Sequence, residues 1–398
     1  MHGVELEGSI QAFVSLIIAF MVIYKSIPVL IKIAYLKDLY DKPDGERKVH
    51  TNYIPTLGGI GIFFALSLGF LFSGFASSLH WTPYMFGVLV ILFFCGLKDD
   101  LVGLSPLKKL SIEISVCSIL LLGGGISIKS LGGVFGVEEI PLWFAFIISL
   151  FTMIVIINSF NLIDGIDGLA GGIGAIASFA FSIGFFISGD LPLAVLGLTL
   201  GVVLIGYLIH NFHPASIFMG DTGSLIIGFL LSVMAINFID LSIVDSYKNL
   251  LGTSSPVMPV AILALPLYDT LRSFTRRISK GNSPFDADSD HIHHNLLKMG
   301  WGQKNTVLYL YFSCFLIILV GVLTSQINVN FSLGAVLLTT LLVFPTNGFK
   351  RSLTIKLGFD IEKAFRPKTN VELFEHLKDA QEKAKRTRQS AFKSEFQD

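Results

Sequence analysis

The sequence predicts an all-α integral membrane protein with about eleven transmembrane helices. Of its 398 residues, 52% are hydrophobic and only 15% are charged, whereas soluble domains carry about 25% charged residues. The apolar residues also gather in runs close to the roughly 20 residues that a membrane-spanning helix needs. Together these observations exclude a soluble domain, and the 35 Phe residues exclude a disordered chain.

Eleven apolar runs are the predicted spans, and several of them are short or interrupted by glycine. In order they cover residues 9–28, 57–75, 83–98, 107–127, 141–158, 169–187, 191–209, 222–240, 257–272, 305–326 and 331–346. Lys and Arg residues favour the cytoplasmic side of a membrane. With the N-terminus outside, 27 of the 29 Lys and Arg residues fall on the inner side. This orientation, with a cytoplasmic C-terminus, is therefore predicted.

The chain divides into a polytopic transmembrane domain, residues 1–346, and a charged cytoplasmic tail, residues 347–398. The tail carries 12 cations and 8 acids, a pattern typical of a solvated or interfacial helix near anionic membrane lipid. The whole chain has no net charge, with 29 cations and 29 acids. This balance disfavours a basic nucleic-acid-binding protein.

Five polar groups stand at the predicted inner ends of spans, where ionisable residues are costly unless they serve a function. They are the segments 41–59, 99–110, 158–172, 211–224 and 283–294. The Lys and Arg count used none of their acids or histidines, yet all five fall on the cytoplasmic side. One site assembled from several cytoplasmic loops is the simplest explanation.

The residue types in these groups favour Mg²⁺-dependent chemistry on a phosphoanhydride. Carboxylates are the oxygen ligands that Mg²⁺ takes alongside substrate phosphates, and histidines and lysines can bind phosphate oxygens. Glycines at helix starts let backbone N–H groups approach an anion. The candidate residues are Asp99, Asp100, Asp164, Asp167, Asp221, His291, His293, His294 and Lys109.

Most of these residues could also have a purely structural role, and the residue types alone do not distinguish that role from a functional one. Asp99 and Asp100 could simply end a helix, Asp221 could be a helix N-cap, and the Asp-Gly segment around Asp164 could be a turn. A zinc site fits the three histidines poorly, because their spacing lacks a typical ligand pattern. Two further acids are expected to be structural: Glu113 as the partner of Lys109, and Asp269 as the partner of Arg272.

At four of these segments the chain resembles the polyprenyl-phosphate N-acetylhexosamine-1-phosphate transferases. The motifs are DDLVGLSPLKKL at 99–110, NSFNLIDGIDGLAGG at 158–172, FMGDTGS at 218–224 and HIHH at 291–294. The histidine motif is similar to that of the undecaprenyl-phosphate N-acetylglucosamine-1-phosphate transferase branch. Some members of that branch carry an arginine shortly before this motif, where Ser289 stands here.

The resemblance implies transfer of N-acetylglucosamine-1-phosphate from UDP-GlcNAc to undecaprenyl phosphate, with release of UMP. It implies Mg²⁺, with Mn²⁺ as an alternative ion, and a bacterial plasma membrane location. Another UDP-HexNAc or UDP-MurNAc-pentapeptide remains open as the donor, as do the downstream polymer (O-antigen, common antigen or teichoic-acid linkage) and a homodimer as the assembly.

The same resemblance implies roles for individual residues. Asp221 would be the main metal ligand, with Asp100 beside it, and Asp99 would contact or deprotonate the lipid phosphate. The catalytic pocket would be completed by Asp164 and Asp167 and by the substrate-binding residues Lys109, Asn161, Asn211, His291, His293 and His294.

A phosphate monoester has a second pKa near 6, so the lipid acceptor is already mostly dianionic at neutral pH and gives a general base little proton to remove. Direct in-line attack is therefore favoured over a covalent aspartyl intermediate.

Two functions other than an enzyme are a transporter and a membrane scaffold. A transporter would place its charges near the membrane midplane, often in repeats, and a scaffold that acts through its tail would leave the aspartate clusters unexplained. Both are therefore disfavoured.

Overall fold

A computed structural model describes residues 2–37, 39–41, 54–241, 256–281 and 291–344. These residues belong to one of the two units into which the chain divides, residues 1–41 together with 54–345. Three predicted features lie outside the described residues. They are the tail at 347–398, most of the first polar segment, and the stretch 283–290 that contains Ser289.

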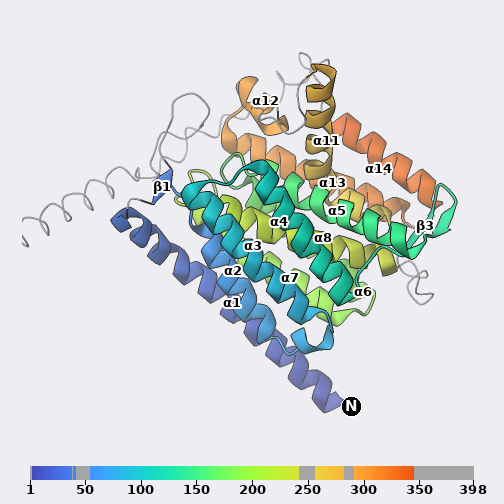
Figure 1. The fold of residues 1–398 in the computed structure, drawn as a ribbon, viewed down its shortest axis with the longest axis horizontal. Helices are drawn as coiled ribbons and strands as arrows, with labels where there is room; N and C mark the ends of the chain where they lie inside the picture. The colour runs from blue at the N-terminus through green and yellow to red at the C-terminus, as the bar shows by residue number, and fades with distance from the viewer. Residues whose placement is uncertain (1, 38, 42–53, 242–255, 282–290, 345–398) are drawn as a thin grey trace, which may run out of the picture. The chain divides into compact units, whose positions relative to one another are not determined.

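The described residues are helical apart from two short antiparallel strand pairs (Figure 1). The elements in order are α1 (His2–Lys37), β1 (Tyr40–Asp41), β2 (Ile54–Pro55), α2 (Gly58–Leu71), a 3₁₀ turn η1 (Ala76–Ser78), α3 (Thr82–Val102), α4 (Pro106–Gly124), β3 (Ser130–Val134), β4 (Val137–Glu139), α5 (Leu142–Leu162), α6 (Leu169–Ile187), α7 (Leu191–Asn211), α8 (Gly220–Asp240), α10 (Val257–Ile262), α11 (Ala264–Ser279), α12 (Ile292–Lys298), α13 (Gln303–Thr324) and α14 (Val329–Val343).

The chain is a multi-pass membrane protein by the length and composition of its helices. Six described helices are long and apolar enough to cross a membrane, namely α1, α5, α6, α7, α8 and α13, and α2 and α14 are shorter apolar helices. Each of the eleven predicted runs coincides with helical residues. The number of crossings and the orientation remain predictions.

The predicted span 257–272 is two helices rather than one. α10 ends at Ile262 and α11 begins at Ala264. Pro266 has no backbone N–H to donate to the Ile262 carbonyl, so the regular hydrogen-bond ladder cannot run through this point. Leu263 joins the two helices in a non-helical conformation, with φ −100° and ψ 18°.

The expectation of an all-α chain missed the β3–β4 hairpin. Ser130 pairs with Glu139 and Val134 with Val137. The turn between the strands requires positive φ at Phe135 (52°) and Gly136 (77°), and glycine adopts this conformation without steric cost. In a hydropathy profile this short segment appears only as a break between apolar runs, with no sign of strands.

Helix α8 is the centre of the bundle and contacts α2, α3, α5 and α6. A Cβ atom on Gly96 of α3 would lie 2.4 Å from Cα of Thr222, and one on Gly59 of α2 would lie 2.3 Å from N of Gly223. Glycine therefore lets both helices touch the α8 backbone at its first turn, as small residues do in membrane helix packing. This contact sets the position of the polar residues that follow Gly96.

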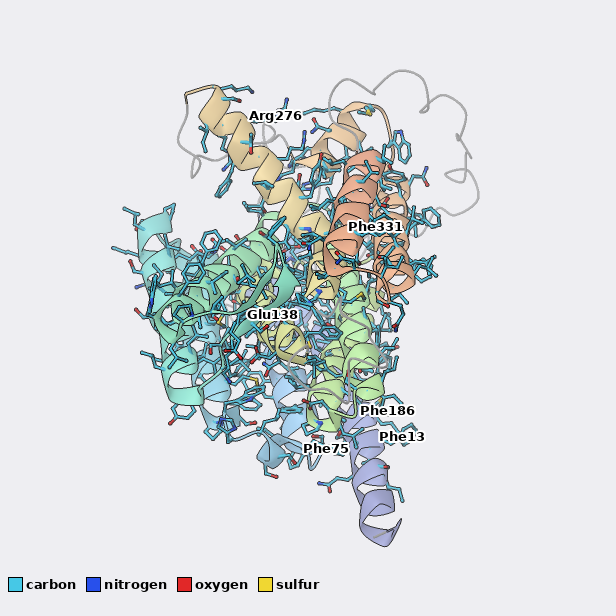
Figure 2. All side chains as sticks on the ribbon, turned by 90° about the vertical axis from the view of Figure 1, so that its right-hand side faces the viewer. Phe13, Phe75, Glu138, Phe186, Arg276 and Phe331 are labelled. Atoms are coloured by element: carbon cyan, nitrogen blue, oxygen red, sulfur yellow. The ribbon has the colours of Figure 1, made fainter. Side chains whose placement is uncertain are left out.

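The outer surface of the helices is apolar. Phe13 of α1, Phe186 of α6 and Phe331 of α14 are 64%, 67% and 60% exposed, on the outside of their helices (Figure 2). Exposed aromatic and aliphatic side chains in this number are expected on a surface that faces lipid rather than water.

Candidate active site

Asp100 joins the end of α3 to the beginning of α8. Its Oδ1 accepts from the backbone N–H of Asp221 at 2.7 Å, and its Oδ2 accepts from the backbone and the hydroxyl of Thr222 at 3.1 and 2.6 Å. A carboxylate at a helix N-terminus is stabilised by these otherwise unpaired N–H groups. Both oxygens are therefore engaged by the protein, and ligation of a metal by Asp100 remains a prediction.

Four side chains from four helix ends form what we call the acidic cluster: Asp99 of α3, Lys109 of α4, Asn161 of α5 and Asp221 of α8. The Lys109 Nζ atom lies 3.1 Å from Oδ2 of Asp99 and 3.1 Å from Oδ1 of Asp221. Asn161 donates from Nδ2 to Oδ1 of Asp221 and, at 2.8 Å, to Ser224 Oγ. The carboxyl groups of Asp99 and Asp221 are themselves in contact.

The acidic cluster suits a small divalent cation. Two carboxyl groups in contact repel each other unless a positive charge or a shared proton lies between them, and here Lys109 supplies that charge. The described residues contain no group of three or more His, Cys, Asp or Glu placed to hold a metal. Mg²⁺ needs only one or two carboxylates when substrate phosphates and water complete its shell, so the donor set fits this ion.

Asp164 lies near the acidic cluster, in the loop between α5 and α6. Its pKa is raised from 3.8 to about 7, first because the carboxyl group is removed from water, and then by the negative charges of Asp221, Asp100 and Asp167. Such a raised pKa is frequent at functional sites, where carboxylates are crowded together.

Asp167 and Asn211 hold two loops of the site against each other. Asp167 Oδ2 lies 2.7 Å from Nδ1 of His213 and accepts from the N–H of Ala215 at 3.0 Å. Asn211 accepts from the N–H of Gly168 at 3.0 Å and donates to the Ile217 carbonyl at 2.8 Å. Both side chains are buried in this network, so the structure ties them to the loop backbone, and the predicted catalytic and substrate-binding roles remain untested.

The three predicted histidines lie at the start of α12, and His293 contacts the loop that carries Asp164. The rings of His291 and His293 are nearly parallel at 5.7 Å, and His294 lies 4.3 Å from His293. A Cβ atom on Gly165 would lie 2.3 Å from His293 Nε2, so this ring packs directly on the backbone next to Asp164. Burial, followed by the charges of His294 and His291, lowers the pKa of His293 well below 6.5.

His293 is one of several described side chains with a buried polar atom that has no hydrogen-bond partner. The side chain is 2% exposed, and its Nε2 atom has no hydrogen-bond partner among the described residues. A buried polar atom without a partner costs free energy, and such atoms in native proteins are often reserved for a ligand or water.

Of the two pairs that were expected to be structural, one is wrong and one is confirmed. The helical spacing predicted that Lys109 pairs with Glu113, but Lys109 pairs with Asp99 and Asp221. Glu113 instead accepts from Asn158 of α5 at 2.5 Å. Asp269 does contact Arg272, at 3.5 Å, as expected. It also contacts His291, which the spacing along the sequence could not indicate.

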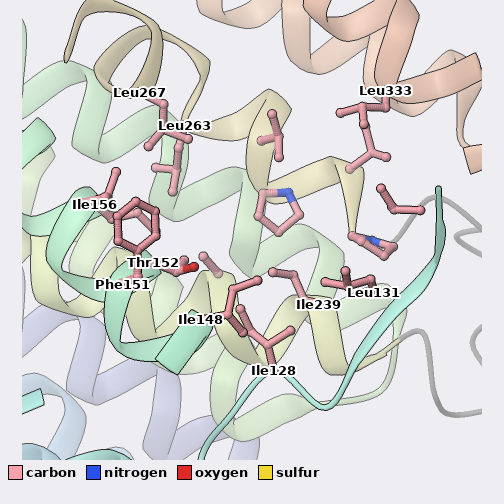
Figure 3. Close-up of a pocket in the computed structure, with 17 residues that line it drawn as sticks. Ile128, Leu131, Ile148, Phe151, Thr152, Ile156, Ile239, Leu263, Leu267 and Leu333 are labelled. Carbon is pink, nitrogen blue, oxygen red and sulfur yellow. The ribbon is translucent and has the colours of Figure 1, made fainter. Parts of the chain in front are cut away.

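An apolar cavity of about 310 Å³ lies beside α5, α8, α10 and α11 (Figure 3). Its walls include Ile148 and Phe151 of α5, Ile239 of α8, and Leu263 and Leu267. The α5 residues of its wall end at Ile156, more than one helical turn before Asn161. The cavity is therefore suited to an apolar group and not to the charged atoms of a phosphate.

Comparison with known proteins gives consistent matches. Residues 82–239 match the family model described as glycosyl transferase family 4. The chain is 31% identical to a probable undecaprenyl-phosphate N-acetylglucosaminyl 1-phosphate transferase of Bacillus subtilis (strain 168), over 82% of this chain and 88% of the relative.

Two further relatives carry related names. An undecaprenyl-phosphate alpha-N-acetylglucosaminyl 1-phosphate transferase of Yersinia pestis is 28% identical, over 75% of this chain and 80% of its own length. A decaprenyl-phosphate N-acetylglucosaminephosphotransferase of Mycobacterium leprae (strain TN) is 31% identical, over 67% of this chain and 72% of its own length.

Proposed function

Because the chain belongs to glycosyl transferase family 4, among relatives that are polyprenyl-phosphate N-acetylglucosamine-1-phosphate transferases, we propose that it uses UDP-GlcNAc as donor and undecaprenyl phosphate as acceptor. An oxygen of the lipid phosphate attacks the β-phosphorus of UDP-GlcNAc. The bond from that phosphorus to the bridging oxygen breaks, and UMP leaves with the bond's electron pair. The product is undecaprenyl-diphosphate-GlcNAc.

The observation that carries this proposal is the acidic cluster. Asp99, Lys109 and Asp221 meet at the ends of three different helices, with Lys109 3.1 Å from both carboxylates. The reaction must bring two phosphate groups together, so fixed positive charge is its main requirement. The cluster has one ammonium group for two carboxylates, so it meets this requirement when the carboxylates also hold a divalent cation beside Lys109.

The described residues supply positioning and charge. The Lys109 ammonium group is the cation next to the reacting phosphates, and Asn161 fixes the orientation of Asp221. Little base catalysis is needed from Asp99, because the acceptor phosphate is mostly dianionic near neutral pH. Burial lowers the pKa of His293 well below 6.5 and so favours its neutral form, and the packing of its ring on Gly165 holds the loop beside Asp164.

Mg²⁺ is the ion that Asp221 would hold, with Asp99 adjacent to it. When bound, it neutralises phosphate charge and polarises the phosphoryl group that is transferred. The predicted location, a bacterial plasma membrane with this site on the cytoplasmic side, is also part of the proposal, because nucleotide sugars are cytoplasmic metabolites.

The apolar cavity supports the choice of an isoprenoid acceptor. It lies next to the same helix, α5, that carries Asn161 at its end. Burial of an isoprenoid chain is favourable by about 25 cal/mol for each Å² of its surface that leaves water. A chain that already lies in the lipid bilayer has left water, so entry into the cavity adds little of this free energy. The cavity therefore favours selection of the acceptor by shape rather than by affinity.

The donor is tested with purified protein, undecaprenyl phosphate and a panel of UDP-sugars: GlcNAc, GalNAc and MurNAc-pentapeptide. UMP release that depends on Mg²⁺ and is fastest with UDP-GlcNAc is the expected result. Faster release with another donor would reassign the sugar, and no release with any UDP-sugar would contradict the proposed reaction.

The same preparation distinguishes direct attack from a covalent intermediate. Labelled UMP is added to UDP-GlcNAc without lipid acceptor. Direct attack predicts no label in UDP-GlcNAc, whereas a phospho-sugar intermediate on an aspartate would exchange UMP freely.

A further inference from the structure

Asp269 is a buried acid on α11 whose contacts go beyond charge balance with Arg272. Its side chain is 2% exposed. Oδ2 lies 2.9 Å from Nδ1 of His291, and Oδ1 accepts from the backbone N–H of Ile292 at 2.9 Å, while Arg272 is more distant, at 3.5 Å. The two shorter contacts both join α11 to the histidine motif.

These contacts fix the motif as a unit. The hydrogen bond to Ile292 holds the backbone at the first turn of α12, and the contact with Nδ1 holds the ring of His291. That ring stacks on His293 with an interplanar angle of 4°, and His293 packs on Gly165 beside Asp164. A row of contacts therefore runs from Asp269 to the loop of the candidate active site.

The chemistry of the pair determines which nitrogen of His291 can serve a substrate. A carboxylate can only accept, so it requires the proton on Nδ1. Nε2, on the opposite edge of the ring, is then the atom available to a ligand. Carboxylates that hold a functional histidine in this way set both its tautomer and its orientation.

We propose that Asp269 is a positioning residue for the transfer reaction, which acts through His291 by fixing its tautomer and ring orientation toward the sugar-diphosphate. This inference rests on the proposed function. It assigns to Asp269 a purpose that a simple ion pair with Arg272 would not have, because an ion pair alone needs no contact with His291.

The test is a double-mutant cycle of Asp269→Asn and His291→Asn, measured as kcat and KM for UMP release. The asparagine can still accept from Ile292 N–H, but it can donate its amide to Nδ1 and so favour the wrong tautomer. We expect Asp269→Asn to lower kcat by about 10- to 100-fold, with a smaller change in KM. In the His291→Asn background the same change should have almost no further effect.

Ser273→Ala, one turn further along α11, is the matched control. Ser273 is fully buried and its hydroxyl has no hydrogen-bond partner among the described residues, so kcat should not change. Asp269→Glu keeps the charge and is expected to retain more activity than Asp269→Asn.

The outcomes separate the two claims. Asp269 would be merely structural if the effects of the two substitutions add fully in the double variant, or if neither Asp269 variant yields folded protein. Either result would overturn the inference, and the proposed function would still stand on the activity of the wild-type protein. If the wild-type protein releases no UMP from any donor, the proposed function fails and this inference fails with it.

Discussion

Asp221 is the single residue on which the account depends most, because Lys109, Asn161 and Asp99 all contact its carboxyl group. Asp221→Asn keeps the shape of the side chain but removes its charge. We expect kcat to fall by at least about 100-fold, as when a fixed electrostatic group is removed from an active site. Initial rates of UMP release measure this effect.

Asp240→Asn is the control for that change. Asp240 lies at the other end of the same helix and pairs with Lys129 at 3.9 Å. Asp240 is partly buried and also accepts from the backbone N–H of Lys129 at 3.2 Å, a hydrogen bond that the asparagine oxygen can keep, so the variant should retain wild-type activity. Equal loss of activity in both variants would mean that any change of charge on α8 disturbs the protein. It would contradict a specific role of the Asp221 carboxylate in the reaction.

Lys109 is the second residue that can be tested alone. Lys109→Gln leaves Asp99 and Asp221 in contact without their cation. We expect activity to fall by about 10- to 100-fold, and higher Mg²⁺ concentrations to restore part of it. Lys108→Gln, next to it and exposed, should have almost no effect. Full activity in Lys109→Gln would contradict the charge-neutralising role.

At the level of single residues, the sequence selected side chains that the structure brings together, but it did not indicate the contacts between them. Residue type and position were enough to select Asp99, Lys109 and Asp221. They were not enough to show that Asp100 would hold the α8 N-terminus, because that contact joins residues 121 positions apart. His213 was missed as the partner of Asp167 for the same reason.

Among the elements, the contact between α3 and α8 decides the geometry of the site. Gly96→Ala would place Cβ 2.4 Å from the Thr222 backbone, so the helices would have to separate next to Asp99 and Asp100. We expect a loss of about 1–3 kcal/mol in the free energy of unfolding together with a loss of activity. Thermal unfolding in detergent and UMP release measure the two effects.

Gly87→Ala on the same helix is the matched control, since a Cβ atom there meets nothing within 4 Å. Alanine is favoured over glycine in a helix by about 0.5–1 kcal/mol, so this variant should be as stable as the wild type or more so. If both variants behave alike, the close approach at Gly96 does not position the site.

The elements that hydropathy predicted well are those whose sequence is apolar throughout, such as α6, found at Leu169–Ile187 as expected. The break at Leu263 and the β3–β4 hairpin were missed. Both depend on local backbone chemistry, proline at 266 and positive φ at 135 and 136, which an average over twenty residues does not register.

For the whole molecule, the orientation predicted from Lys and Arg places the β3–β4 turn outside and the end of α11 inside. Cysteines introduced at Phe135 and at Ser279 in separate variants should react from opposite sides with a membrane-impermeant thiol reagent. The native Cys95, Cys117 and Cys314 are all buried, so they give little background. Labelling of both positions from the same side would overturn the predicted topology.

The central claim is that the chain transfers a sugar together with its phosphate, and the fate of the β-phosphorus tests it most directly. UDP-GlcNAc labelled with ³²P at the β position is incubated with purified protein, Mg²⁺ and undecaprenyl phosphate. The account predicts that the label moves into the lipid-soluble product and that the released nucleotide is unlabelled UMP. Label that stays with the nucleotide as UDP would mean that only the sugar is transferred, and would contradict the account.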